Sequence, residues 1–556
     1  MKQGKWMIVV LTLLFAATAF MIEKEEISTQ NFPFSVTVTS DGRQEKIGCV
    51  KIAEAYYVFF PGYAAPEDAQ ICANRIYDVS IDGQWLSDGQ SCGVFPENSA
   101  LELCVRSGKT EEVTTVTFVR SADVATMFVD VASGSMEYIH QKKGNTEAAD
   151  IRIYTPEGQL NYIGSAEAVK GRGNATWDME KKPYNVELLQ PADLLDMGSA
   201  QNWVLLSNAY DSSHIRGKTA YDTAAAAGMA YSPECNWVDL YLNGEYAGLY
   251  LLCEKNEIHS QRVRLPADSS FLVSQEYEFR LYNQGYSYIE TDNRLAFRIH
   301  YSAVSQTELE SRWQSVENAI LAADGMDPLT GKNWQELIDL DSWAHRYLLD
   351  ELFGNFDGGF LSQFYYCDTS EPEAKIYAGP IWDMDNCMGA DRWVISNPCS
   401  FLANRQHFSS KEDVSLFYAL YQKQPFHDRV VALFESVYEP LFQELINGGL
   451  QNYEDQISRA AAADQLRWGV VQDQSAEDMA DFLQKRLNFF RDLWINGTEY
   501  CRVDMAAEDF FRWSCYMVKK GDCLTQLPEG AWYDMETDEP FDIAEPIVTD
   551  RCIYQP

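Results

Sequence analysis

The sequence predicts an α+β fold, with a β-rich first part and a helical second part. Short runs of alternating apolar residues, typical of strands, fill much of residues 27–302. After Gln306 the apolar residues take the three-and-four spacing of amphipathic helices, which continues with interruptions to Asn496. With 556 residues, 46% of them hydrophobic, the chain is long enough for several domains with cores of their own.

The amino-terminal residues 1–22 have the layout of an export signal. Lys2 and Lys5 precede an apolar run from Met7 to about Ile22, and alanines lie near the end of that run. The run is short for a membrane span of roughly 20 residues, yet no Ala-x-Ala site clearly ends it. We therefore expect either a cleaved signal peptide or an uncleaved membrane anchor, and in both cases an extracellular or cell-surface location.

The chain is strongly acidic, with 83 Asp and Glu against 44 Lys and Arg and a net charge of −39. Such a surface argues against a protein that binds nucleic acid or an anionic membrane. It also makes any local group of basic residues informative, because a phosphorylated ligand needs positive charge around it.

Thirteen cysteines are concentrated towards the two ends of the chain. In an exported protein this distribution predicts disulfides, and the odd total leaves at least one thiol. No C-x-x-C pair occurs, so a zinc site made of thiolates is not expected. The two flanking groups are Cys49, Cys72, Cys92 and Cys104 near the start, and Cys501, Cys515, Cys523 and Cys552 near the end.

Three segments follow the amino-terminal signal. Residues 27–121 alternate in short runs such as FSVTVTS and TTVTFVRS, which predicts a small β-sandwich domain. Residues 125–496 hold all of the motifs described below. Residues 497–556 form a Cys-rich tail in which few regular elements are expected.

A glycine-containing loop followed by a strand carries three basic residues. The stretch VKGRGNATWDMEKKPYNVELL, residues 169–189, holds Arg172, Lys181 and Lys182, and its last part alternates as a strand does. In several phosphotransferases such a loop donates backbone amides to phosphate oxygens while the lysine supplies charge. The alternative is a β-hairpin with a basic edge.

A helix and a hairpin come next. In WVLLSNAYDSSHIRGKTAYDTAAAAG a helix is expected from Asp211 to Gly228. Arg216 lies on its first turns, where it reaches either a phosphate or a neighbouring carboxylate. The stretch VDLYLNGEYAGLYLLCE then predicts a hairpin that ends at Glu254, because the Asn-Gly pair at 243–244 suits a type I′ turn.

Carboxylates follow regular elements at two places in the second part. The helix WQELIDLDSWAHRYLLDELFG runs into GNFDGG, which contains Asp357, and the strand FYY follows. Further on, GPIWDMDNCMG places Asp383 and Asp385 one residue apart before a glycine. Carboxylates this close are stable mainly where a divalent cation or several donors neutralise them, so the pair is expected to hold a metal. The alternative is a solvated acidic turn.

Together the motifs divide the work of phosphoryl transfer between cations in the first half and carboxylates in the second, as in protein-kinase-like enzymes. The sequence resembles the CotH kinase family of secreted or spore-associated atypical protein kinases, over roughly residues 125–496. The resemblance rests on GRGNATW, KKPYNVEL, LLSNAYDSSHIRGK, VDLYLNGEYAGLYLLCE, GNFDGG and GPIWDMD, in that order.

This resemblance implies an atypical bilobal protein-kinase-like domain, with a β-rich N-lobe and a helical C-lobe, that uses ATP and Mg²⁺ or Mn²⁺. The catalytic residues it implies are Lys182, Asp357 and Asp383. The nucleotide-binding residues it implies are Arg172, Lys182, Arg216 and Glu254. The metal ligands it implies are Asp383, Asp385 and Gln363. Gln363, in LSQFYY, stands where the family usually has Asn, which leaves reduced activity or an altered metal preference open.

Three functions remain as alternatives at this point. The first is an exported kinase that transfers the ATP γ-phosphate to Ser or Thr of surface or coat proteins. The second keeps the fold but transfers AMP. The third is a non-catalytic cell-surface scaffold or adhesion protein with a degenerate kinase-like domain. For the kinase, the expected partner is a protein rich in Ser and Thr, with no nucleic acid.

Overall fold

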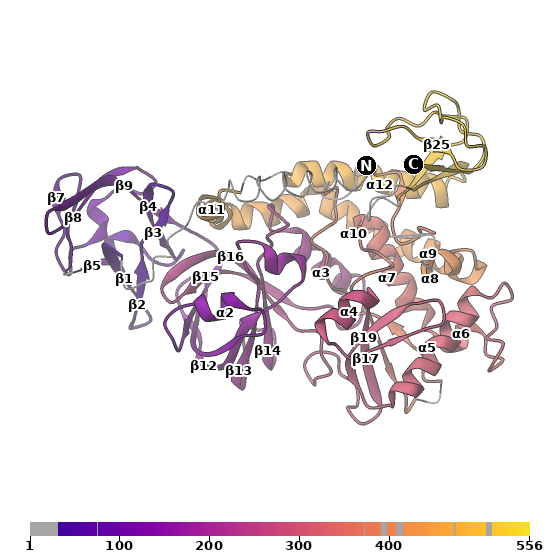
Figure 1. Ribbon diagram of the computed structural model, residues 1–556, viewed down its shortest axis with the longest axis horizontal. Helices are drawn as coiled ribbons and strands as arrows, with labels where there is room; N and C mark the ends of the chain where they lie inside the picture. The colour runs from indigo at the N-terminus through magenta and orange to yellow at the C-terminus, as the bar shows by residue number, and fades with distance from the viewer. Residues whose placement is uncertain are drawn as a thin grey trace, which may run out of the picture.

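The structure is a computed structural model, and it places the β-sandwich, the barrel and the mixed sheet one after another along an elongated molecule (Figure 1). The amino-terminal signal expected in residues 1–22 lies outside the described residues. No helix in the described part is long and apolar enough to cross a membrane. The structure describes residues 32–74, 76–371, 373–390, 397–406, 415–470, 472, 474–506 and 514–556.

The first sheets form a sandwich with a shared core. Val36 and Ile71 from one sheet and Val58 and Leu103 from the other are fully buried in that core. One sheet has the order β2-β1-β5, made of β1 (Phe34–Ser40), β2 (Arg43–Gly48) and β5 (Gln70–Ala73). The other has the order β3-β4-β9-β8-β6-β7, made of β3 (Val50–Ile52), β4 (Ala55–Phe60), β6 (Asp78–Ile81), β7 (Gln84–Trp85), β8 (Leu101–Ser107) and β9 (Thr110–Arg120).

Seven strands then close into a barrel in the order β10-β11-β12-β13-β14-β16-β15, with β15 parallel to β10. Buried side chains such as Met127, Val186 and Leu240 fill its interior. The strands are β10 (Ala125–Val131), β11 (Thr146–Tyr154), β12 (Leu160–Gly171), β13 (Tyr184–Asp193), β14 (Ser199–Leu206), β15 (Cys235–Leu242) and β16 (Glu245–Glu254), with helices α2 (Glu137–Gln141) and α3 (Arg216–Ala226) in the connections.

The hairpin predicted from the Asn-Gly pair is confirmed. Strands β15 and β16 pair antiparallel, and Leu242 lies opposite Glu245 across the turn. Asn243 and Gly244 have φ of 51° and 81°, the positive values that both central residues of a type I′ turn require.

A mixed unit of sheet and helices follows the barrel. Its sheet has the order β18-β19-β17-β20-β21, and one face packs on α5 and α7, where the rings of Phe297 and Trp313 lie 3.9 Å apart and those of Trp343 and Tyr365 lie 5.0 Å apart. Its elements are β17 (Ser270–Glu276), α4 (Glu278–Gln284), β18 (Tyr288–Glu290), β19 (Ala296–Ser302), α5 (Gln306–Leu321), α6 (Trp334–Leu337), α7 (Leu340–Phe353), β20 (Gln363–Asp368) and β21 (Tyr377–Ala378).

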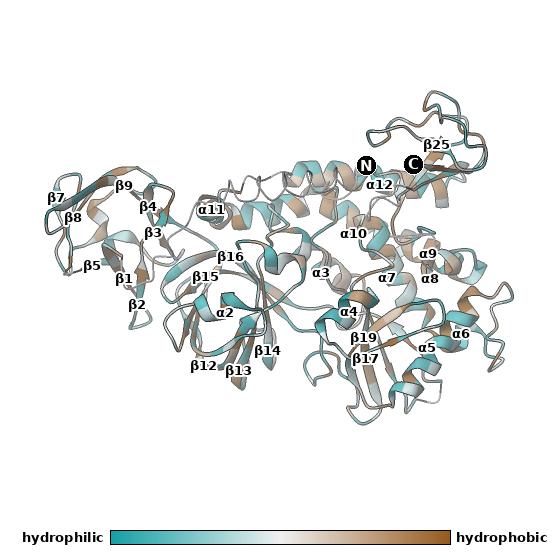
Figure 2. Cartoon of the chain, in the orientation of Figure 1, coloured by the Kyte–Doolittle hydropathy of each residue, from teal (hydrophilic) through white to brown (hydrophobic). Residues whose placement is uncertain are grey.

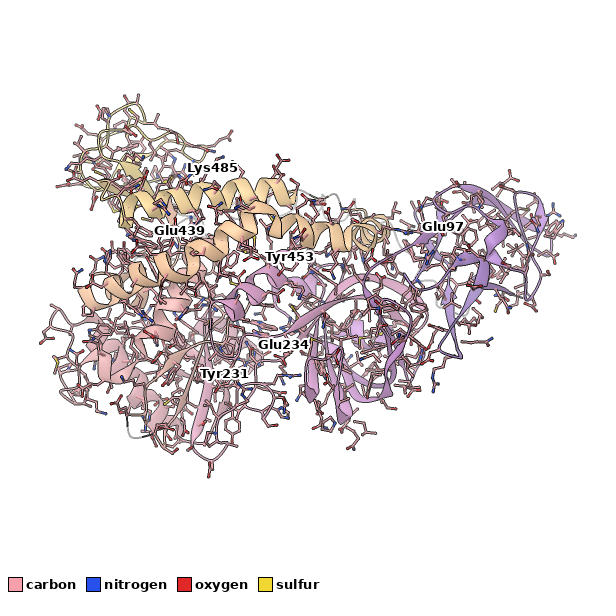
Figure 3. All side chains as sticks on the ribbon, turned by 180° about the vertical axis from the view of Figure 1, so that it is seen from behind. Glu97, Tyr231, Glu234, Glu439, Tyr453 and Lys485 are labelled. Atoms are coloured by element: carbon pink, nitrogen blue, oxygen red, sulfur yellow. The ribbon has the colours of Figure 1, made fainter. Side chains whose placement is uncertain are left out.

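The remaining helices run back along the molecule. Hydrophilic and hydrophobic residues alternate around α11 and α12 (Figure 2), and α12 buries Met479, Leu483 and Phe490. The reverse view shows Tyr453 on α11 and Glu97 where the sandwich meets this helix (Figure 3). The helices are α8 (Leu416–Tyr421), α9 (Gln424–Leu433), α10 (Glu439–Glu444), α11 (Leu450–Trp468) and α12 (Ala476–Trp494).

The carboxy-terminal segment is more regular than expected. Together with β22 from earlier in the chain, it forms a sheet of order β22-β24-β23-β26-β25, because residues such as Cys501 and Val503 point into a small core. The strands are β22 (Ser400–Phe401), β23 (Tyr500–Ala506), β24 (Ser514–Lys519), β25 (Tyr533–Asp534) and β26 (Arg551–Tyr554).

The predicted disulfides find no support in the structure. All thirteen cysteines lie among the described residues, and no two of them are bonded. Many act as small apolar core residues instead. For Cys49 and Cys92 burial raises the pKa of the thiol to about 12, which makes these thiols unreactive near neutral pH.

Candidate functional site

Two loops of the mixed unit lie side by side and carry the acidic motifs. The first follows α7, whose end is capped by Gly354 in the left-handed conformation (φ 67°). The second follows β21. Backbone hydrogen bonds join them: Phe356 N donates to Asn386 O at 3.1 Å, and Met388 N donates to Phe353 O at 2.7 Å. The loops therefore bring together motifs that are separate in the sequence.

Three carboxylates from these loops and from β17 form one group, which we call the carboxylate group: Glu276, Asp357 and Asp383. Ser362 connects two of them, because its Oγ donates to Asp383 Oδ2 at 2.9 Å and lies 3.5 Å from Glu276 Oε1. Ser362 therefore brings Glu276 beside Asp383, and the predicted Asp357 lies within electrostatic reach of Asp383. Glu276 adds a third acid that the motifs did not indicate.

The members of the carboxylate group repel one another. Burial, together with the negative charge of Asp383, raises the pKa of Glu276 to about 8. Burial and the charge of Asp383 likewise raise the pKa of Asp357 to about 7. Such shifts mark carboxylates whose charges lack full compensation, and a cation bound among them would relieve the repulsion.

The backbone at Asp383 has an unusual conformation. Its φ of 63° lies in the left-handed region, which Asp tolerates better than most residues but which still costs energy. The Asp383 side chain is exposed, whereas Met384 beside it is buried. Asp385, the other acid of the motif, is half-buried.

The donor set fits a partly hydrated metal ion better than a closed protein cage. Among the described residues, no group of three or more His, Cys, Asp or Glu side chains is already arranged to hold a metal. Mg²⁺ usually keeps several waters and is bound by one or two carboxylates together with phosphate oxygens. The exposed Asp383 and the nearby Asp385 match that pattern.

Arg172 is the predicted cation that the structure brings to this group. It follows β12, its amide donates to Pro183 O at 3.1 Å, and its guanidinium lies 5.5 Å from the ring centroid of Trp382. Burial lowers the pKa of Arg172, while the charges of Asp383 and Asp385 act in the opposite direction. The barrel therefore presents a positive charge to the acids of the mixed unit.

Lys182 binds backbone carbonyl groups of its own loop. Its Nζ donates to Trp177 O at 2.9 Å and to Met179 O at 3.3 Å, and it lies 4.7 Å from the ring centroid of Trp177. These contacts brace the short 3₁₀ turn at Ala175–Asp178. No hydrogen bond or ion pair in the described residues joins Lys182 to the carboxylate group.

Arg216 is a buried connector. Its Nε donates to Cys387 O at 3.0 Å, and its Nη1 donates to Asp211 Oδ1 at 2.5 Å. Asp211 Oδ2 also accepts a hydrogen bond from Arg216 N at 3.0 Å. Arg216 thus ties the start of α3 to the loop that carries Asp383 and Asp385, so its contacts position that loop.

Glu254 ends β16 in a buried ion pair with Arg262. One of its oxygens accepts a hydrogen bond from Glu234 N at 3.0 Å, and burial raises the pKa of Glu254 to about 7. Figure 3 shows Glu234 where the chain returns to the barrel. The Glu254 carboxylate therefore joins the segment that leaves the barrel after β16 to the segment that enters it before β15.

Gln363 lies at the start of β20 and is fully buried. Its Nε2 donates to Leu361 O at 3.0 Å, whereas its Oε1 has no hydrogen-bond partner among the described residues. The side chain makes no hydrogen bond to Asp383 there. The neighbouring Ser362 provides that contact instead.

Sequence reasoning missed Glu276 as a member of the site. The one local signal for it is its place at the end of the apolar run FLVSQ, since polar residues at strand ends often belong to sites. That signal is weak, because its position beside Asp383 depends on the antiparallel pairing of β17 with β20.

The fold and the site define an α+β protein with an acidic, cation-facing site at the junction of a closed barrel and a mixed sheet. A family model described as CotH kinase protein matches residues 169–490, more than half of the chain. The chain therefore belongs to the CotH kinase family, which confirms the resemblance seen in the motifs. No curated protein matches the sequence.

Proposed function

We propose that this protein is an exported, metal-dependent kinase that transfers the γ-phosphate of ATP to Ser or Thr hydroxyls of surface or coat proteins. The observation that carries the proposal is the convergence of Glu276, Asp357 and Asp383 opposite Arg172. Membership of the CotH kinase family supports a kinase-like activity. In this proposal the barrel and the mixed unit act as the two lobes of the enzyme.

Each residue has a role that follows from its surroundings. Asp383 and Asp385 would hold Mg²⁺ or Mn²⁺, which neutralises charge on the phosphate oxygens when bound. Asp357 has its pKa raised to about 7, mainly by burial, which suits a group that accepts a proton from a hydroxyl near neutral pH. Arg172 supplies positive charge for the phosphate from the barrel side, and Arg216 holds the metal loop in place.

The test is transfer of labelled phosphate by the purified full chain. ATP labelled on the γ-phosphate is incubated with Mg²⁺ or Mn²⁺ and a Ser-rich protein, in parallel with ATP labelled on the α-phosphate. We expect the protein substrate to be labelled only from the γ-phosphate. The rate of this transfer should be at least 100-fold lower in Asp383→Asn. Asp292→Asn is a matched control, because Asp292 is an exposed acid of the same unit, in the turn before β19. Label from the α-phosphate would show AMP transfer instead.

A second candidate function is nucleotide binding without turnover, on a surface scaffold. The side chain of Gln363 favours it, because this implied metal ligand is buried and its amide nitrogen is bound to the backbone carbonyl of Leu361. Binding of ATP measured by calorimetry, together with no transfer of either label, would select this function over the kinase.

A further inference from the structure

A cleft lies where the β-sandwich meets the barrel, and it shares no described residue with the carboxylate group. Its volume is about 940 Å³. Every residue of β2 except Ile47 lines it, and the barrel contributes Phe128, Asp130, Arg152 and the turn at residues 243–244. Figure 1 shows β2 on the side of the sandwich that faces the barrel. A space of this size along one strand is large enough to hold a ligand.

Strand β2 is one of the two edges of its sheet, and the opposite edge, β5, is covered. On β5, Ile71 N donates to Gln90 O at 2.8 Å, and Ile71 O accepts from Gly89 N at 2.9 Å. Ala73 N donates to Asp88 Oδ1 at 2.8 Å. These bonds occupy the outward backbone groups of β5. A further strand that joins this sheet therefore has to join it at β2.

The backbone of β2 is open along part of its outer edge. Gly48 N donates to Gly244 O at 2.9 Å, so the amide of Gly48 points away from β1. In an antiparallel ladder this direction repeats every second residue, so the amides of Lys46 and Gln44 point the same way. The carbonyl of Lys46 packs against Gly244. Gln44, in contrast, makes no backbone hydrogen bond outside its sheet among the described residues, so the open part of the edge centres on it.

The charges on the barrel wall of the cleft already balance one another. Arg152 donates through Nε to Glu45 Oε1 at 2.8 Å and through Nη2 to Asp130 Oδ2 at 2.5 Å. The hydroxyl of Tyr154 donates to the same oxygen of Glu45 at 2.7 Å, and the Glu45 side chain is buried. These bonds hold β2 against the barrel, so the two walls of the cleft are fixed relative to each other.

Two exposed cations of β2, Arg43 and Lys46, have no such partners. Neither forms an ion pair or a side-chain hydrogen bond in the part of the chain that the structure describes. Because side chains alternate along a strand, Arg43 lies on the face that carries Glu45, within electrostatic reach of Tyr154. Lys46 lies on the opposite face with Gln44. The open edge of β2 is therefore flanked by a positive charge on each face, in a chain with a net charge of −39.

We propose that an extended, acidic segment of another protein binds in this cleft as an additional strand against β2. The backbone of the segment pairs with Gln44, and its side chains alternate between the two faces of the sheet. Two adjacent acidic residues then meet Arg43 on one face and Lys46 on the other. The open backbone edge favours a polypeptide over an anionic polysaccharide, which would use the cations alone. This inference goes beyond the proposed kinase activity and does not depend on it.

The experiment measures binding of a fluorescent peptide, made of pairs of Glu separated by Val, to the full chain by anisotropy. We expect at least tenfold weaker binding in the double variant Arg43→Gln with Lys46→Gln. We expect the same in Gln44→Pro, which removes the outward amide and spares the ladder with β1. Gln44→Ala, which keeps that amide, and Lys109→Gln, which removes an exposed lysine of the sandwich outside the cleft, are the matched controls. Melting curves check that each variant is folded.

A peptide of the same sequence with methylated backbone amides keeps its charges but cannot donate to β2, so it should not bind. Equal binding of the two peptides, or of the first peptide to the double variant and to Lys109→Gln, would overturn the proposal. So would polygalacturonate that binds with the same dependence on Arg43 and Lys46 where the peptide does not bind, because the cleft would then belong to a polysaccharide. If the peptide does not bind and the double variant aggregates, the two cations only protect the strand edge, and the proposal is wrong.

Discussion

Lys181 Nζ lies 2.6 Å from Asp464 Oδ1, and both side chains are buried. The same carboxylate oxygen accepts a hydrogen bond from Leu249 N at 2.8 Å, while the other lies 3.2 Å from His214 Nε2. Lys181 also donates to Leu249 O at 2.7 Å. Of the two adjacent lysines, Lys181 therefore fastens the barrel to α11, and Lys182 braces the loop before β13.

Replacing Lys181 should destabilise the whole protein. In Lys181→Met the Asp464 carboxylate stays buried without its main partner, and removing one partner of a buried ion pair typically costs about 3–5 kcal/mol. Urea denaturation should show this loss in the free energy of unfolding. Lys485→Met, which removes an exposed ion pair with Asp481, should change it by less than about 1 kcal/mol. Similar losses in the two variants would contradict the structural role of Lys181.

Glu276→Gln should stabilise the protein in a pH-dependent way. Because burial and Asp383 raise the folded-state pKa of Glu276 to about 8, the folded protein binds more protons than the unfolded chain above the ordinary pKa of 4.5. The contribution of Glu276 to the free energy of unfolding of the unchanged protein therefore falls as pH rises from about 4.5 to 8. Glu276→Gln has no charge to bury at this position, so the difference between its melting temperature and that of the unchanged protein should grow between pH 5 and pH 8.5. An advantage that shrinks as pH rises would contradict the raised pKa.

Gly358→Ala should disturb the loop that carries Asp357. A Cβ at Gly358 would lie 2.8 Å from Asp350 Cβ and 2.9 Å from Asn355 O, which is too close for ordinary contact. We expect a loss of about 1–3 kcal/mol in the free energy of unfolding, measured by denaturation. Gly144→Ala is the matched control, since a Cβ there meets nothing within 4 Å, and it should leave stability nearly unchanged. Full stability in Gly358→Ala would show that the loop can move.

Asp383 should control metal binding. Mn²⁺ relieves the repulsion within the carboxylate group, so titration followed by electron paramagnetic resonance should detect binding, at least tenfold weaker in Asp383→Asn. Asp292→Asn should bind Mn²⁺ as the unchanged protein does. If both variants bound equally, the metal would lie elsewhere.

Much of the fold could be predicted from local patterns. The Asn-Gly turn determines its own backbone, so the hairpin of β15 and β16 was recognisable. The predicted helix from Asp211 in fact begins at Arg216, because Asp211 accepts hydrogen bonds from Ser213 N and Arg216 N in a turn and His214 has a φ of 61°. The closure of the barrel could not be seen, since it depends on pairing between β10 and β15, far apart in the chain.

The candidate site, like the fold, could be predicted only in part from the sequence. Asp357 and Asp383 each follow a regular element and carry a local motif, so both were predicted. Which of two adjacent lysines is buried is decided by Asp464 on α11, far along the chain, and nothing near the lysines indicates it. The charge of Arg298 acts on Glu276 only because β19 pairs with β17, and the sequence around Arg298 is that of an ordinary strand.

The closed barrel has a consequence for where this protein can be divided. The segment that matches the family begins at residue 169, after β10 and β11 and near the end of β12. A fragment cut there would keep only part of the ring and expose the unpaired edges of β13 and β15, which invites aggregation. The sandwich is not a removable appendage either, since Phe59 stacks on Tyr246 of the barrel at 4.6 Å. The part that folds as one piece is therefore larger than the part that is recognised.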